Sequence, residues 1–115
     1  MPYMRLDTNL NINKNTLSEL ITKTSSIIST FLGKPESYVL IHVNSDQSMI
    51  FAGSQEPLAY IELKSIELPK NQTEPLSSLL CDFVAEELNI PANRIYIEFT
   101  NIDRSMWGWN NKTFE

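Results

Sequence analysis

The chain has few of the residue types from which many functional sites are built. Its 115 residues include one cysteine, one histidine and three glycines. A lone cysteine excludes an internal disulfide and a Cys-x-x-Cys redox pair, and one cysteine with one histidine cannot form an ordinary zinc site. Three glycines do not allow a glycine-rich phosphate loop. We therefore expect no metal and no cofactor.

Clustered positive charge and long apolar runs are also missing. The formal net charge is −5 and the Lys and Arg residues do not cluster, which argues against nucleic acid as a partner. No apolar run approaches the ~20 residues of a membrane span, and residues 1–5 lack the basic and apolar regions of a signal peptide. The composition, 42% hydrophobic and 20% charged, is typical of one globular domain over residues 1–115, which we expect in the cytoplasm and away from membranes.

The single Cys81 and the single His42 lie in ordinary surroundings. Cys81 belongs to an apolar helical pattern, which indicates packing rather than reactivity. His42 lies in a strand-like run, which favours a structural or surface role. No local motif supports a catalytic triad.

The first half of the chain has the pattern strand, helix, strand. Residues 3–7 alternate weakly and predict a strand. Thr16 and Glu19 have the spacing of a capping box, which would start a helix, and apolar residues follow at helical spacing until Gly33 and Pro35 end it. Residues 38–43 are rich in β-forming side chains and predict the second strand.

The second half repeats this pattern. Residues 58–63 and 94–99 predict strands, and between them lies a helix with Pro75 in its first turn and Pro91 after its end. The two halves match at an offset of 56 residues. This offset pairs residues of the helix face, the helix stop and the strand face: Leu20 with Leu76, Ile28 with Val84, Pro35 with Pro91, Val39 with Ile95 and Ile41 with Ile97.

The repeat predicts an α/β fold made of two duplicated βαβ units, about residues 1–57 and 58–115. Each unit should cross over right-handed and pair its strands in parallel. Together they form a four-stranded mixed sheet with both helices on one face. We expect the open sheet face to be apolar and to need a partner, which favours an oligomer. The aromatic stretch 107–114 would either reach another subunit or cap its own core.

Pro2 has two interpretations. It could begin an edge strand, where a missing N–H costs little. Alternatively, removal of Met1 would leave a free prolyl amine, and terminal amines titrate near the pH at which a general base works best. Position alone favours the first interpretation.

Several motifs occur in a specific order and spacing. They are Met1-Pro2, Gly33-Lys34-Pro35, Arg94-Ile95-Tyr96-Ile97 and Gly108-Trp109-Asn110-Asn111. With them the chain resembles, essentially from end to end, the family of macrophage migration inhibitory factor and D-dopachrome tautomerase in the tautomerase superfamily. The resemblance implies a homotrimer with inward-facing sheets. It also implies keto–enol tautomerisation of α-keto acids such as phenylpyruvate, with Pro2 as general base and acid.

The resemblance also implies roles for other residues. Lys34 would bind the substrate carboxylate and disfavour a charged Pro2, although a lysine after a helix end is also favoured by the helix dipole. The backbone N–H of Ile66 would contact a carboxylate or enolate oxygen. Tyr96 would come from the neighbouring subunit. Trp109 and Phe114 would hold a phenyl ring at the pocket mouth, with Tyr38 a weaker candidate.

The chain departs from the family at several of these positions. Glu98 stands where vertebrate members have Asn, and a carboxylate at the rim should weaken the binding of anionic substrates and raise the Pro2 pKa. Trp107 replaces a small aliphatic residue, which would narrow the pocket, and Tyr3 is larger than the usual residue beside the proline. The Cys-x-x-Cys of the vertebrate protein is absent, so thiol–disulfide exchange is not available.

Two other functions fit the same sequence. One is a cytokine-like or host-directed binding protein with a vestigial pocket. The other is a regulatory ferredoxin-like domain, which has the same two βαβ units and would show ligand-linked stability without turnover. Turnover of phenylpyruvate that depends on Pro2 separates the enzyme from both.

Overall fold

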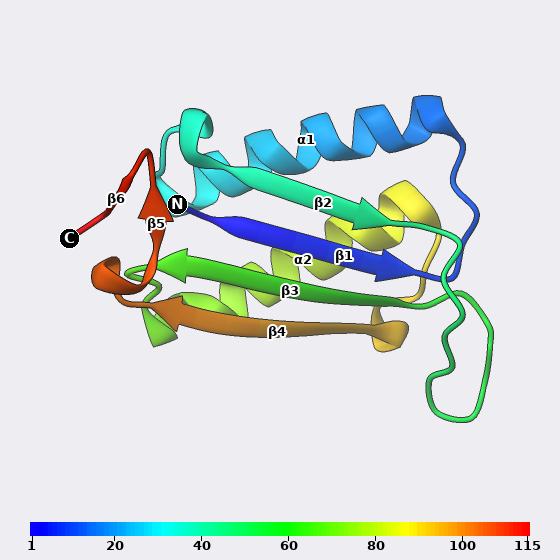
Figure 1. Cartoon of the computed structure of the whole chain (residues 1–115). Coiled ribbons are helices and arrows are strands. Elements are labelled where there is room, and N and C mark those ends of the chain that lie inside the picture. The colour runs from blue at the N-terminus through cyan, green and yellow to red at the C-terminus, as the bar shows by residue number, and fades with distance from the viewer.

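A computed structural model describes residues 1–115 and shows a layer of sheet in front of a layer of helices (Figure 1). Its main elements are, in chain order, β1 (Tyr3–Thr8), α1 (Lys14–Leu32), β2 (Leu40–Asn44), β3 (Ala59–Ile66), α2 (Thr73–Leu88) and β4 (Ile95–Ile102). A small hairpin of β5 (Gly108–Trp109) and β6 (Lys112–Thr113) follows. Short 3-10 helices are η1 (Glu36–Tyr38), η2 (Lys70–Gln72), η3 (Ala92–Arg94) and η4 (Arg104–Met106).

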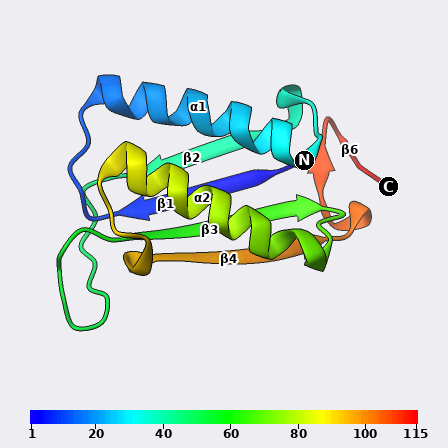
Figure 2. The ribbon, with the colours of Figure 1, turned by 180° about the vertical axis from the view of Figure 1, so that it is seen from behind.

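The sheet has the strand order β2-β1-β3-β4. Each βαβ unit pairs its two strands in parallel, and the antiparallel pair β1–β3 joins the units at the centre. Both helices cover the same face, as the view from behind shows (Figure 2). The expected α/β fold with a mixed four-stranded sheet is therefore confirmed.

The internal repeat extends to backbone conformation. The span of α1, moved by 56 residues, coincides with η2 followed by α2. Gly33 and Asn89, at the same offset, both end their helices in the left-handed region, with φ of 64° and 56°. Pro35 and Pro91 then open 3-10 helices with φ of −59° and −58°. The two units thus end their helices by the same backbone path although the side chains differ.

Some predicted boundaries are wrong. The helix α1 begins at Lys14, not at the Thr16–Glu19 pair, because Asn13 is the N-cap: its backbone is extended and its Oδ1 accepts from Thr16 N at 2.9 Å. Thr16 is therefore already inside the first turn. Tyr38 belongs to η1, and β2 starts at Leu40. Both β3 and β4 run three residues further than predicted.

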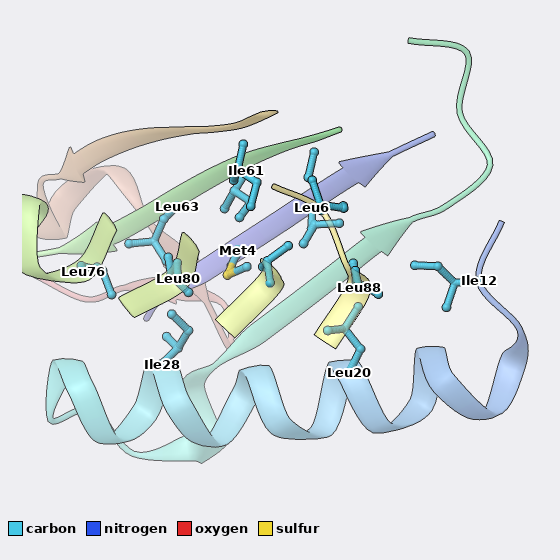
Figure 3. Packing of buried hydrophobic residues seen from close by; sticks show 14 of the residues in the cluster. Met4, Leu6, Ile12, Leu20, Ile28, Ile61, Leu63, Leu76, Leu80 and Leu88 are labelled. Carbon is cyan, nitrogen blue, oxygen red and sulfur yellow. The ribbon is translucent and has the colours of Figure 1, made fainter. Parts of the chain in front are cut away.

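The core fills the space between the sheet and the helices (Figure 3). Met4 and Leu6 from β1 lie among side chains of β3, α1 and α2, all almost fully buried. Alternation along β1 explains this, since every second residue faces the helices. Cys81 is half-buried on α2, and burial raises the pKa of its thiol, in agreement with a packing role.

The open face of the sheet is polar, so the expectation of an apolar face is wrong. Arg5 Nε lies 3.1 Å from Asp7 Oδ2, and Arg5 Nη2 lies 3.1 Å from Glu62 Oε2. Lys64 Nζ lies 3.0 Å from Glu62 Oε1. His42 is exposed on β2. The same alternation that buries Met4 and Leu6 places charged residues on the other face. An interface on this face would therefore contain water and polar contacts instead of a dry apolar core.

Two kinds of feature were not found among the described residues. Neither long helix carries an apolar stretch that would let it cross a bilayer. No group of three or more Asp, Glu, His or Cys side chains is placed to hold a metal ion.

Candidate functional site

The N-terminal amine lies in a protected position at one end of the sheet. It donates a hydrogen bond to the main-chain oxygen of Tyr38 at 2.8 Å. Partial burial, and then the positive charge of Lys34, lower the pKa of this Met1 amine from 8.0 to about 6. An amine with this pKa is mostly neutral at pH 7 and can accept a proton.

Pro2 is buried and precedes the central strand β1. Its carbonyl accepts a hydrogen bond from Leu40 N at 3.0 Å, which ties the start of β1 to β2. The interpretation of Pro2 as the start of an edge strand is therefore wrong, because β1 has neighbours on both sides. In the chain with Met1, the Pro2 nitrogen is an amide without a basic lone pair.

Lys34 follows the end of α1 and has a fixed backbone. Its N–H donates to Ser29 O at 3.1 Å, and Ser29 Oγ donates to Lys34 O at 2.6 Å. Its ammonium group is close enough to the N-terminus to lower the pKa of the amine, and it also lowers the pKa of Glu67. The fixed backbone thus keeps the positive charge of Lys34 in the vicinity of the amine.

Three aromatic rings form a box next to the amine. Tyr38 meets Trp109 edge-on at 5.5 Å between centroids and Phe114 edge-on at 5.6 Å. Trp109 and Phe114 stack at 5.8 Å with only 7° between their planes. Together with Met1 and Trp107 they line a pocket of about 220 Å³. Within this chain the C-terminal aromatic stretch therefore packs against its own η1.

A second hollow lies beside this box, at the end of β3. It has a volume of about 410 Å³, and Ile66, Glu67 and Arg104 are among its lining residues. Arg104 Nε lies 2.8 Å from Glu67 Oε1, and Arg104 Nη1 donates to Phe114 O at 3.3 Å. Arg104 and then Lys34 lower the pKa of the Glu67 carboxyl. Arg104 thus connects the end of β3 to the segment that carries Phe114.

Sequence reasoning missed the pair of Glu67 and Arg104. Glu67 adopts φ of 57°, a left-handed conformation that non-glycine residues seldom take. A glutamate gives no signal of this turn in the sequence. The only sequence feature that points to a role of Glu67 in the site is its position directly after Ile66.

Tyr96 and Glu98 lie away from the amine within one chain. Tyr96 pairs with Tyr60 near the start of β4, and Tyr60 in turn pairs with Asp7 near the end of β1. Glu98 lies halfway along the edge strand β4, beside Glu62 of β3. Both are exposed on the open face. The structure therefore brings together Pro2, Lys34, Trp107, Trp109 and Phe114, places Ile66 in the adjoining hollow, and separates Tyr96 and Glu98 from them.

A larger hollow of about 630 Å³ lies at the loop between β2 and β3. Residues such as Asn9, Gln47, Ile50 and Gln55 line it, and none of its lining side chains is ionisable. It offers no acid or base that could activate its Ser48 hydroxyl. The smaller pocket at the N-terminus is therefore the better candidate for chemistry.

Comparison with known proteins gives a consistent result. The family model described as macrophage migration inhibitory factor matches residues 1–115. A macrophage migration inhibitory factor homolog of Brugia malayi is 45% identical over 120 residues, covering 99% of both chains. The homolog of Trichinella spiralis is 37% identical over 115 residues, covering 99% of this chain and 100% of that one. The crystal structure of a homologue from Prochlorococcus marinus superposes with a TM-score of 0.92 at 36% identity, covering 98% and 99% of the chains.

Proposed function

The chain belongs to the macrophage migration inhibitory factor family, and from this premise we propose that it is a cofactor-independent keto–enol tautomerase. Its substrates are phenylpyruvate-like α-keto acids, and its general base and acid is the amine of Pro2 after removal of Met1. The observation that carries the proposal is the position of buried Pro2, directly after a Met1 amine whose pKa is lowered to about 6 by burial and by Lys34 and which lines the aromatic pocket.

The reaction moves one proton and needs no co-reactant. Removal of Met1 converts the Pro2 amide nitrogen into a secondary amine with a lone pair. In its neutral form this amine takes the proton from the carbon next to the ketone, and the electrons of the C–H bond form the enolate. The prolinium then returns the proton to the enolate oxygen. A base with a pKa near the working pH serves both steps.

The surrounding residues have separate tasks. Lys34 attracts the substrate carboxylate and disfavours a second positive charge on Pro2. Trp109 and Phe114 offer flat apolar faces to the phenyl ring, and Trp107 limits the width of the pocket. The N–H of Ile66 stabilises negative charge as it develops on oxygen.

A homotrimer completes the site in this proposal. The pocket of about 220 Å³ is smaller than an ordinary ligand site, and Tyr96 and Glu98 are too far along the sheet to line it within one chain. A neighbouring copy that contributes its own Tyr96 and Glu98 would enlarge and close the pocket. Three sites would then lie between three subunits.

The test compares phenylpyruvate turnover of the wild type and Pro2→Gly, with intact mass establishing the loss of Met1. We expect Pro2→Gly to lose activity by at least about 100-fold, the usual contribution of a general base. Pro75→Gly, an exposed proline in the first turn of α2, is the matched control and should stay active. A folded trimer with a free Pro2 and no turnover would overturn the proposal in favour of a binding protein.

A further inference from the structure

The loop between β2 and β3 ends in a tight reversal with a defined shape. Phe51 and Ser54 exchange two main-chain hydrogen bonds, each of 3.0 Å. The two residues between them, Ala52 and Gly53, have φ of 53° and 74°. This is the conformation of a two-residue hairpin turn. The Phe51 ring contacts the ring of Tyr96, near the start of β4.

Arg94, the last residue of η3, holds this loop by its main chain. Its guanidinium donates to the carbonyl oxygens of Phe51 at 3.0 Å, Ser54 at 2.9 Å, Glu56 at 3.0 Å and Pro57 at 3.0 Å. The rigid fork of the guanidinium allows several such contacts at once. The loop is therefore fixed to the same end of β4 that carries Tyr96.

The Phe51 ring lies between Arg94 and Tyr96. The Arg94 guanidinium carbon is 5.3 Å from the ring centroid, within range of a cation–π contact. The Tyr96 ring is 4.5 Å from Phe51 between centroids, at an angle of 35°. Tyr96 is otherwise 60% exposed on the open face, so Phe51 is the aromatic support that restricts its side chain.

We propose that Phe51, held by Arg94, is a positioning residue that orients Tyr96 for entry into the pocket of the neighbouring subunit. The inference rests on the proposed function, in which Tyr96 acts on the site of another copy. An exposed tyrosine without support would lose side-chain conformational entropy when it closes over a substrate, and this loss would weaken binding. Phe51 restricts the Tyr96 side chain before the substrate binds, so this entropy loss is smaller. Its effect is therefore on substrate affinity and not on proton transfer.

Phe51→Ala tests the support. We expect KM for phenylpyruvate to rise about 3- to 10-fold while kcat stays within about twofold, because Pro2 and Lys34 are untouched. Phe51→Tyr keeps the ring contact and should restore KM. Gln55→Ala, which shortens an exposed side chain of the same loop, is the control and should leave both constants unchanged.

The failure of this inference differs from the failure of the proposed function. If Pro2→Gly is inactive but Phe51→Ala keeps the wild-type KM, the positioning role is wrong and the tautomerase stands. If Pro2→Gly is fully active, the proposed function itself is wrong. A rise in KM that Phe51→Tyr does not reverse would also overturn the positioning role.

Mixed trimers test whether Phe51 acts across the interface. Pro2→Gly and Phe51→Ala chains are co-expressed, and mixed trimers are isolated. In a mixed trimer, whichever chain is present twice, one site in three combines an intact Pro2 with an intact neighbouring Phe51. We expect these sites to add a component with the wild-type KM. If Phe51 served the pocket of its own chain, no site would be intact, and the absence of that component would overturn the inference.

Discussion

The Tyr60 hydroxyl donates a hydrogen bond to Glu98 Oε1 between β3 and β4, on the sheet face that the helices leave open. This bond raises the pKa of Tyr60 to about 12, since the carboxylate stabilises the protonated phenol. Glu98 is thus engaged with its own chain, whereas the proposed function assigns it to the rim of the pocket in a neighbouring copy.

The first prediction concerns the titration of Tyr60. In Glu98→Asn the pKa of Tyr60 should fall from about 12 toward the ordinary value of 10.0, because the main cause of the shift is removed. The ultraviolet absorbance of tyrosinate, followed with rising pH, measures this change, and Tyr60→Phe identifies the transition. A profile that is the same in Glu98→Asn and the wild type would show that the bond does not form in solution.

Glu98 should also weaken the binding of anionic substrates. Replacing it with Asn removes a negative charge from the rim, so KM for phenylpyruvate should fall about two- to fivefold, the scale of an exposed charge interaction. Added salt should narrow the difference because it screens the repulsion. Glu56→Gln, in the exposed loop, is the control. An unchanged KM in Glu98→Asn would contradict the repulsion.

The N-terminal amine makes stability depend on pH. In the chain that retains Met1, the folded pKa of about 6 is below the unfolded value of 8.0, so the unfolded state binds more protons between these values. The free energy of unfolding should therefore rise with pH from about 6 to 8 and lose this contribution as pH falls through 6. Denaturant unfolding across this range measures the slope.

Lys34→Ala should reduce that slope without abolishing it, because burial is the larger cause of the lowered pKa and Lys34 the smaller. Lys14→Ala, at the far end of α1, should leave the slope unchanged. The opposite result, a slope independent of Lys34 and dependent on Lys14, would show that the ammonium of Lys34 does not face the amine.

The two helix ends predict different responses of stability to substitution. Gly33→Ala should lower the free energy of unfolding by about 1 to 2 kcal/mol, the cost of a left-handed conformation for an L-residue. No atom lies within 4 Å of an added Cβ, so the cost is conformational and not steric. Asn89→Gly should leave the free energy of unfolding almost unchanged. It relieves the strain of the left-handed conformation, but it also raises the conformational entropy of the unfolded chain. Urea unfolding of both variants tests these predictions. A free energy of unfolding in Gly33→Ala equal to that of the wild type would contradict them.

Much of the fold could be predicted because its signals are local and occur twice. The 56-residue offset joined Pro35 to Pro91 and defined two βαβ units before any contact was known. The start of α1 could not be settled in the same way, since Asn13 and Thr16 are both good caps and only the backbone conformation selects one. The polar open face follows from the alternation of Arg5 and Asp7 with Met4 and Leu6, because side chains of alternate residues in a strand point to opposite faces.

The residues of the candidate site could be predicted from the sequence, but most of the contacts between them could not. Lys34 and Trp109 belong to motifs, Phe114 follows three residues after the second of them, and all three residues gather near the N-terminus. Their contacts with Tyr38 depend on how η1 meets the C-terminal hairpin, which no local pattern describes. The link from Arg104 to Glu67 depends on a left-handed residue without a glycine. Such contacts between distant segments follow from tertiary packing and not from spacing.

The attachment of the β2–β3 loop has a consequence for protein engineering. Arg94 binds the loop only through main-chain oxygens, and Phe51 is the one loop side chain that joins the contact. The path of the loop is thus largely independent of its other side chains. Residues 47–50 could be exchanged for a foreign recognition peptide while Phe51 and the turn are kept, which would make this loop an insertion site on an otherwise unaltered scaffold.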